Sequence, residues 1–309
     1  MRTHHRFPAF GVLVAVLLHV LPATAQDNVV WLDGHNLLFD DVVHVAAGDY
    51  QVTIAPPALD LMQKSYELVL AAEEQGIPIY GLNRGVGLNK DRKIKDNKEA
   101  SQQFNINNLR SASAGVGPDA PEILVRAAMV IRLNTMLLGR TGARPQVAEL
   151  YRDFLNKKIH PVLPSRASLG EADITILAHV GLAMMGEGDV IYAKMGSSVR
   201  SRMTAQEALD DAKIKPLAPF AKDSLAIMSS NAYSAAVAIL AARDVQRLLT
   251  IAPGVFALSL EGLKGNTAPF LKPAQDVRGY ASTQKWAAKV LDQLEGSSSG
   301  SVQAKRARR

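Results

Sequence analysis

The chain has 309 residues, of which 48% are apolar, contains no cysteine, and carries a formal net charge of +6. Without cysteine it can form no disulfide and no thiolate metal site. The net positive charge comes from residues 1–25 and 297–309, which contain basic residues but no acid. Residues 26–296 therefore have a formal net charge of zero. A neutral body with basic ends lacks the electrostatic footprint of a nucleic-acid-binding protein, and no nucleic acid partner is expected.

The first 25 residues have the pattern of a signal peptide. Two arginines precede an apolar run over residues 10–21, and residues 23–25 (Ala-Thr-Ala) are small, as at a cleavage site. The run is shorter than the roughly 20 residues of a membrane span; an uncleaved N-terminal anchor is the alternative. We therefore expect an exported protein, periplasmic or secreted, with a mature chain that starts near Gln26 and no stable membrane span.

Residues 26–120 are predicted to form a small N-terminal α+β part. Short runs rich in β-branched residues, separated by turn residues, predict strands and a small sheet at 29–32, 37–39, 42–45 and 50–54. After Pro56-Pro57 the apolar spacing becomes helical and continues to Gly76.

Residues 121–296 are predicted to form a bundle of long helices. Apolar spacing predicts helices over 121–139, 145–157, 173–185, 222–250 and 282–294. Asp173 is placed at an N-cap, and Thr204 with Glu207 forms a capping box that opens a short helix. Arg132 and Asn134 lie in an apolar stretch and predict a buried hydrogen-bonded pair. Residues 297–309, rich in serine and then basic, are predicted to be disordered.

A glycine-rich segment carries the first chemical signal. Residues 80–87 read Tyr-Gly-Leu-Asn-Arg-Gly-Val-Gly, and such a loop can approach a ligand closely. The segment resembles the Tyr-Gly-Val-Asn-Thr-Gly-Phe-Gly motif of the aromatic amino acid lyases, the family of histidine and phenylalanine ammonia-lyases. The resemblance implies that Tyr80 is the base that removes a proton from the substrate β-carbon, and that Asn83 and Gly87 contact the substrate. The alternative is a tyrosine that anchors the loop by packing.

A second segment departs from the family. Family members cyclise an Ala-Ser-Gly tripeptide, within Gly-Ser-Val-Gly-Ala-Ser-Gly-Asp-Leu-Ala-Pro-Leu-Ala-His, into an electrophilic methylidene-imidazolone group (MIO). Residues 168–179 read Ser-Leu-Gly-Glu-Ala-Asp-Ile-Thr-Ile-Leu-Ala-His, with neither the serine nor the spacing between Gly170 and Asp173. We therefore expect no MIO and no other cofactor. Glu171 precedes an apolar helix, whose dipole favours a negative charge; it is a capping carboxylate, a clamp for the substrate ammonium group or a general acid, and we include it among the catalytic candidates.

Three further segments supply candidate substrate contacts. Residues 107–117 resemble the family's Asn-Leu-Leu-Arg-Ser-His run, with Ala112 in place of the histidine that recognises the ring in histidine ammonia-lyases; here Ser111 is either a polar contact or part of a capped loop. Residues 222–231 resemble Lys-Glu-Gly-Leu-Ala-Leu-Ile-Asn-Gly-Thr, with Ser229 in place of the asparagine that supports the electrophile. Gln284 matches the end of the family's Arg-Pro-His-Pro-Gly-Gln run. No metal site is predicted.

The resemblance covers residues 35–296 and implies a mainly α, ammonia-lyase-like fold of the L-aspartase-like superfamily. It also implies a homotetramer, for a full-length chain, whose active sites combine loops of different subunits. Because the family continues beyond Gly296, we expect a truncated member. The implied function is a lyase that eliminates ammonia or trimethylamine from an aromatic or imidazole α-amino acid, or from its betaine, without MIO, as in the branch similar to ergothionase. The alternative is an inactive, truncated homologue that acts as a binding protein or is a remnant.

Overall fold

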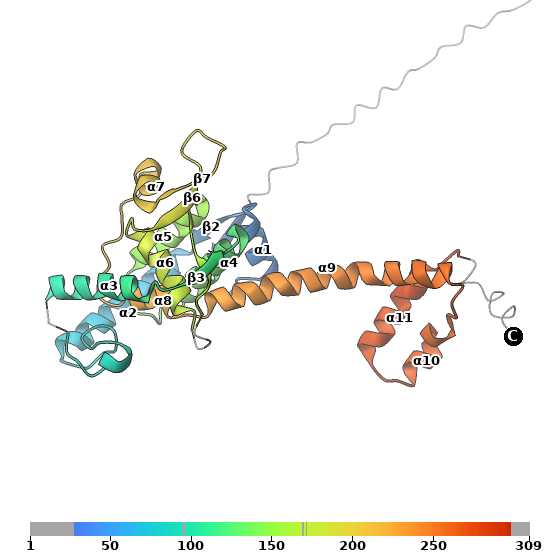
Figure 1. The fold of residues 1–309 in the computed structure, drawn as a ribbon. Helices are drawn as coiled ribbons and strands as arrows, with labels where there is room; N and C mark the ends of the chain where they lie inside the picture. The colour runs from blue at the N-terminus through green and yellow to red at the C-terminus, as the bar shows by residue number, and fades with distance from the viewer. Residues whose placement is uncertain (1–27, 95–96, 169, 171, 298–309) are drawn as a thin grey trace, which may run out of the picture.

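Figure 1 shows packed helices and short strands, from which one long helix, α9, leads to a small helical hairpin. The computed structural model describes residues 28–94, 97–168, 170 and 172–297. The predicted signal peptide, Glu171 and all but the first residue of the predicted disordered tail lie outside these residues. Helices dominate the described chain, so the predicted mainly α fold is confirmed. The predicted division near residue 120 stays a prediction.

The N-terminal part is a strand–helix–strand unit. Strands β1 (Val29–Leu32) and β2 (Gln51–Ile54) pair in parallel. Parallel neighbours need a crossover, which α1 (Phe39–Ala47) supplies. The small predicted sheet is therefore present, but the predicted strands at 37–39 and 42–45 are wrong. Most of these residues lie in α1, because their valines also fit a helical spacing that buries one face.

Helices form most of the remaining body. Those in the body are α2 (Pro56–Glu74), α3 (Lys98–Ala112), α4 (Glu122–Met136), α5 (Pro145–Asn156), α6 (Ile174–Met184), α7 (Ala205–Ala212) and α8 (Asp223–Met228). Helices α2, α4, α5, α6 and α7 were predicted, and the capping box that opens α7 is present. Helix α3 was not, because its buried face includes Asn105 and Asn108, which an apolar pattern does not detect.

In the part of the chain that the structure describes, two short antiparallel sheets complete the body. Strands β4 (His160–Pro161), β6 (Asp189–Tyr192) and β7 (Ser201–Thr204) pair in that order, and β3 (Val116–Asp119) pairs with β5 (Pro164–Arg166). The short helix η1 (Gly87–Asn89) lies in the glycine-rich loop. These elements surround one apolar core, to which β1, β2, α1, α4, α5 and α6 all contribute.

Helix α4 runs through the core and carries polar side chains that bind the backbone of other elements. Arg132 Nε donates to the carbonyl oxygen of Ala226 at 2.7 Å. Asn134 Oδ1 accepts from the Gly34 amide at 3.0 Å. Both residues are buried and hydrogen-bonded as predicted. The predicted pairing between them is wrong, because Arg132 binds α8 and Asn134 binds the loop that follows β1.

The predicted helix over 222–250 is two helices, α8 and α9 (Ala232–Gly262), with a break at residues 229–231. The Ser230 carbonyl accepts from the Asp173 amide at 2.8 Å, and the Asp173 carboxylate accepts from the Ser234 amide at 2.8 Å. Asp173 occupies the predicted N-cap position of α6, but its side chain binds the first turn of α9 instead. The break therefore anchors the start of α6, which follows the segment expected to carry chemistry.

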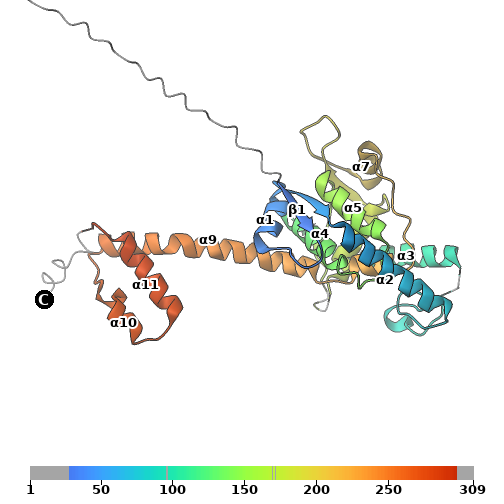
Figure 2. The ribbon, with the colours of Figure 1, turned by 180° about the vertical axis from the view of Figure 1, so that it is seen from behind.

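Beyond the body, α9 ends in a hairpin with η2 (Ala268–Phe270), α10 (Lys272–Asp276) and α11 (Ala281–Gln293), as Figure 2 shows from behind. Its 31 residues make α9 about 45 Å long. The hairpin has its own small core, formed by Ala257, Val290 and Leu294.

Among the described residues, the helical segment Asp223–Gly262 is long and apolar enough to cross a membrane by length and composition. One such segment is weak evidence, because a core helix of a water-soluble protein passes the same test. The first residues of α9 lie in the core, where Ala232, Tyr233 and Ala236 are buried.

A buried histidine makes stability depend on pH. Burial, aided by Arg126, lowers the pKa of His160 from 6.5 to about 3. Its Nδ1 lies 3.3 Å from the Glu122 carboxylate, but outside hydrogen-bonding geometry, and Arg200 already pairs with that carboxylate. Burial and the cations therefore prevail, and the folded imidazole is neutral.

Between pH 6.5 and 3, His160 binds a proton in the unfolded chain but not in the folded chain. The free energy of unfolding therefore falls as the pH falls. At pH 5 this linkage costs roughly 2 kcal/mol. We expect the urea midpoint of His160→Gln to change less between pH 7.5 and pH 5 than that of the unchanged chain. The exposed His35→Gln variant is the control and should behave like the unchanged chain. An equal pH dependence for His160→Gln would contradict the prediction.

Candidate active site

The loop of residues 80–87 presents a tyrosine held at two points. The Tyr80 side chain is 47% exposed, and its phenol oxygen accepts from the Gly87 amide at 2.9 Å. Lys222 Nζ donates to the Tyr80 carbonyl oxygen at 2.9 Å. These contacts fix both ends of the residue and leave the ring accessible. The contact with Gly87 lies within the same loop, so the predicted base and the alternative of a tyrosine that anchors the loop both stay predictions.

The remaining loop residues shape the turn around Tyr80. Asn83 accepts from the Ile79 amide at 2.7 Å and donates to the Ile77 carbonyl at 2.8 Å, so its amide group closes the loop. Gly81 has a φ of +71°, and an added Cβ would lie 2.7 Å from Leu225 Cδ2. Glycine is thus required where the loop meets α8. The substrate contacts predicted for Asn83 and Gly87 stay predictions; the geometry favours loop-shaping for Asn83.

The Lys222 contact predicts a measurable effect on the loop. Replacing Lys222 by methionine keeps the stem but removes a charged donor, and such a hydrogen bond is worth about 1.5 kcal/mol. We expect amide hydrogen exchange over residues 80–84 to become about tenfold faster. Lys215→Met, at an exposed lysine nearby in sequence, is the control and should leave exchange unchanged. Unchanged exchange in Lys222→Met would show that the lysine does not hold the loop.

Helix α8 brings several predicted segments together. The glycine-rich loop contacts α8 at Leu225, and Ser229 is exposed at the C-terminal end of the helix, about 6 Å further along. Helix α3 lies alongside, where Asn108 Nδ2 donates to Ser224 Oγ at 3.3 Å. Ser111, one turn later on α3, is exposed and donates to the Asn108 carbonyl. Ser111 therefore lies in a helix, and the alternative of a capped loop at this position is wrong.

The segment that departs from the family lies close to Ser229. Ser168 Oγ accepts from the Gly170 amide at 3.2 Å, and Asp173 is buried and bound to Ser230 and Ser234. Glu171 lies outside the described residues, so its three alternatives stay open. Within the described residues, no hydrogen bond joins Tyr80 to Ser111, Ser229 or Gly170.

Gln284 lies apart from the other candidates. It is on α11 in the distal hairpin, where Nε2 makes long contacts to the Gln275 carbonyl at 3.5 Å and to Asp276 at 3.4 Å. The structure thus groups Tyr80, Asn83, Gly87, Ser111 and Ser229 around α8. It separates Gln284 from them by more than half of α9, because the neighbouring Ser282 and Thr283 lie beside Leu249.

The sequence patterns did not identify the residues that support this group. Asp223 is fully buried and accepts from Arg144 Nε at 2.8 Å and from the Phe220 amide at 3.0 Å. Asn105 binds both the Ala221 carbonyl and the Ser224 amide. The signal was present in residues 222–231, whose likeness to the family includes Lys222 and an acid at position 223, but no role followed from the sequence alone.

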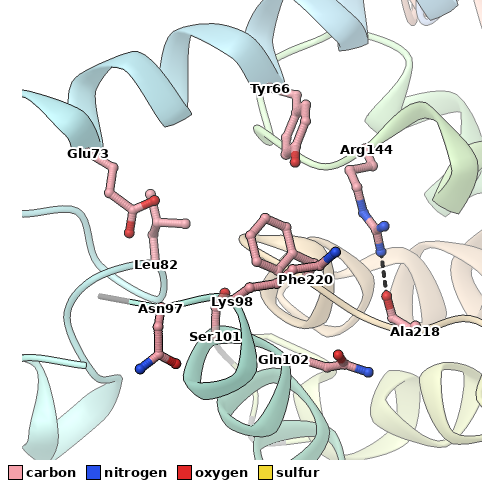
Figure 3. Close-up of a pocket in the computed structure, with 10 residues that line it drawn as sticks. All are labelled: Tyr66, Glu73, Leu82, Asn97, Lys98, Ser101, Gln102, Arg144, Ala218 and Phe220. Atoms are coloured by element: carbon pink, nitrogen blue, oxygen red, sulfur yellow. Dashed lines mark hydrogen bonds between the residues drawn. The ribbon is translucent and has the colours of Figure 1, made fainter. Parts of the chain in front are cut away.

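A cavity of about 610 Å³ lies beside this group. Figure 3 shows the side chains that line it, which come from α2, the start of α3 and the segment before α8. Leu82 lines the cavity but Tyr80 does not, so the cavity and the exposed phenol are separate features. Within the residues that the structure describes, no group of three His, Asp or Glu side chains is arranged to hold a metal ion.

The family model for aromatic amino acid lyases matches residues 37–309. The chain therefore belongs to the aromatic amino acid lyase family. It is 33% identical over 267 residues to histidine ammonia-lyase of Geobacillus sp. (strain WCH70), covering 86% of this chain and 51% of that protein. Against histidine ammonia-lyase of Gloeobacter violaceus the identity is 34%, covering 86% of this chain and 50% of that protein.

Solved structures confirm the fold. Ergothionase from Treponema denticola, in complex with desmethyl-ergothioneine sulfonic acid, superposes with a TM-score of 0.79 at 37% identity, over 85% of this chain and 51% of that one. Tyrosine aminomutase from Streptomyces globisporus gives a TM-score of 0.78 at 29% identity, over 86% and 49%. The chain thus spans about half the length of the curated relatives it matches.

Proposed function

We propose that the protein is a carbon–nitrogen lyase that eliminates ammonia or trimethylamine from an aromatic or imidazole α-amino acid, or from its betaine, without an MIO group. The observation that carries the proposal is the exposed Tyr80 phenol, held by the Gly87 amide and by Lys222, in a chain of the aromatic amino acid lyase family. The likeness to ergothionase supports a betaine as the substrate.

The proposed reaction balances without an added electrophile. Tyr80, as the base, takes the proton from the β-carbon, and the electrons of the broken C–H bond form the carbon–carbon double bond. The electrons of the C–N bond leave with the nitrogen, and a trimethylated nitrogen departs as neutral trimethylamine. A protonated ring on the substrate would absorb developing charge. Ser111, Ser229, Asn83 and Gly87 are the proposed contacts around this ring and its carboxylate.

The segment before α6 supports a reaction without MIO. Cyclisation needs a serine that loses water and an amide that attacks the carbonyl two residues earlier. Between Gly170 and Asp173 the chain has Glu171 and Ala172, and Ser168 lies before this stretch with its hydroxyl turned to the Gly170 amide. Ser229 stands where the family has the asparagine that supports the electrophile.

Incubation of the full chain with histidine betaine, ergothioneine, histidine and phenylalanine tests the proposal. We expect the ultraviolet band of an unsaturated product to appear with a betaine, and released trimethylamine to match it in amount. No product from either substrate class would reject the lyase. A peptide lighter by the mass of two waters across residues 168–173, one from ring closure and one from a side-chain hydroxyl, would reject the absence of MIO.

We also propose that the chain forms a homotetramer. Along α9 from Val245 to Leu258, several apolar side chains are more than half exposed, and a contiguous exposed apolar surface marks an interaction site. They are Val245, Leu248, Leu249, Ile251, Val255 and Leu258. A discrete tetramer in size-exclusion chromatography with light scattering is expected. Aggregates would favour the alternative, an inactive homologue or remnant, which the same exposed surface supports.

Export to the periplasm or out of the cell is the proposed localisation, from the signal-peptide pattern of residues 1–25. Sequencing of the protein recovered from a bacterial host should give an N-terminus near Gln26. Recovery of the intact N-terminus from the cytosol would contradict export.

A further inference from the structure

The cavity beside the glycine-rich loop has the size of a small-molecule site. Its volume of about 610 Å³ falls within the range of roughly 300–1,000 Å³ typical of ligand pockets. Helix α2 contributes Tyr66 and Glu73, and the segment before α8 contributes Ala218 and Phe220. The proposed lyase chemistry uses none of these residues.

One end of the cavity offers two hydrogen-bond donors. Arg144 is fixed there, because Nε and Nη2 bind the Asp223 carboxylate and Nη2 also binds the Ala218 carbonyl at 2.6 Å. These bonds leave Nη1 without a hydrogen-bond partner among the described residues. The Tyr66 hydroxyl also has none, and burial raises the pKa of Tyr66, so it keeps its proton. Two donors at one end suit the two oxygens of a carboxylate.

The lining also offers apolar surface and a second cation. Figure 3 shows the Phe220 ring below the Tyr66 hydroxyl, with the Arg144 guanidinium beside the ring. Leu82, which is buried, adds a second apolar surface, and Lys98 adds a cation to the lining. A planar ring can stack on Phe220, and the donors of Tyr66, Arg144 and Lys98 suit a negative group on the same ligand.

We propose that this cavity is a second binding site, for a small carboxylate that carries a planar ring. The carboxylate accepts from Tyr66 Oη and Arg144 Nη1, and the ring lies against Phe220. Because Arg144 is already paired with Asp223, it contributes mainly a hydrogen bond, and Lys98, which also lines the cavity, contributes the positive charge. The site needs no lyase activity, since Tyr80 does not line it.

Calorimetric titration of the full chain with phenylacetate tests the site. We expect a Kd of roughly 1 mM or below, with weaker binding of phenylacetamide, which lacks the charge, and of acetate, which lacks the ring. Tyr66→Phe should weaken phenylacetate binding about tenfold, the effect of one hydrogen bond to a charged group. Tyr50→Phe, in the same body but outside the cavity, is the matched control and should bind as the unchanged chain does.

Two measurements place the ligand. Phenylacetate should protect amides of residues 66–73 and 218–220 from hydrogen exchange, and Tyr80→Phe should bind it normally. Absence of saturable binding up to tens of millimolar would overturn the proposal, as would equal binding of phenylacetamide. Weakened binding in Tyr80→Phe with normal binding in Tyr66→Phe would place the ligand at the exposed phenol and would overturn it too. None of these outcomes depends on whether the chain is a lyase.

Discussion

Tyr80→Phe is expected to slow formation of the unsaturated product by a factor of about 10² to 10⁴, the contribution of a positioned general base. The substitution removes the oxygen that takes the proton and keeps the ring. The folded loop loses one hydrogen bond, from the Gly87 amide, while the Lys222 contact to the backbone remains. The rate should therefore fall with little change in the urea midpoint.

The measurement is the initial rate with a betaine substrate, followed at the ultraviolet band of the product. Tyr50→Phe removes a phenol that stacks on His44, away from α8, and should retain the full rate. A Tyr80→Phe variant as fast as the unchanged chain would remove Tyr80 from the mechanism, even if the chain proves to be a lyase.

Asp223→Ala is expected to have the largest effect on stability, about 3–5 kcal/mol. The carboxylate is fully buried and accepts hydrogen bonds from the Arg144 side chain and amide and from the Phe220 amide. Removing it leaves a mostly buried guanidinium without its counter-ion, and two backbone donors without acceptors. Because these bonds join α5 to α8, the loss also loosens the helix around which the candidate residues gather.

Urea unfolding of Asp223→Ala measures this effect, and Asp223→Asn, which keeps the shape and part of the hydrogen bonding, should lose less. Asp60→Ala, at an exposed acid that makes no hydrogen bond or ion pair with its side chain within the described residues, should stay within about 0.5 kcal/mol of the unchanged chain. If Asp223→Ala is as stable as Asp60→Ala, the buried pair contributes nothing to the fold.

The sequence predicted elements whose signals are local. Thr204 and Glu207 lie three residues apart and cap α7 by their own contacts, so the pattern sufficed. The valines of α1 fit both a strand and a helix, and only the parallel pairing of β1 with β2 requires the helix. The break between α8 and α9 is held by Asp173, which is distant in sequence. Residues 229–231 (Ser-Ser-Asn) favour turns and caps, but the apolar spacing on both sides outweighed this short signal.

The same distinction applies to the candidate site. Tyr80, Asn83 and Gly87 lie in one short loop, so a contiguous motif located all three. The partner of Tyr80, Lys222, is 142 residues away in sequence, and its contact follows from the packing of the loop on α8. The cavity depends on Tyr66, Arg144 and Phe220 from three separate segments, and no spacing in the sequence indicates it.

The length of α9 predicts that two inactive variants can complement each other when they are co-expressed. More than half of this helix of about 45 Å lies between Tyr80 and Gln284 within one polypeptide, so a reaction centre that needs both must draw them from different copies. Two defective proteins, Tyr80→Phe and Gln284→Ala, should then rescue each other when co-expressed, because some mixed assemblies contain a centre with both native side chains. Co-expression without rescue, in assemblies shown to be mixed, would mean that Gln284 has no part in catalysis.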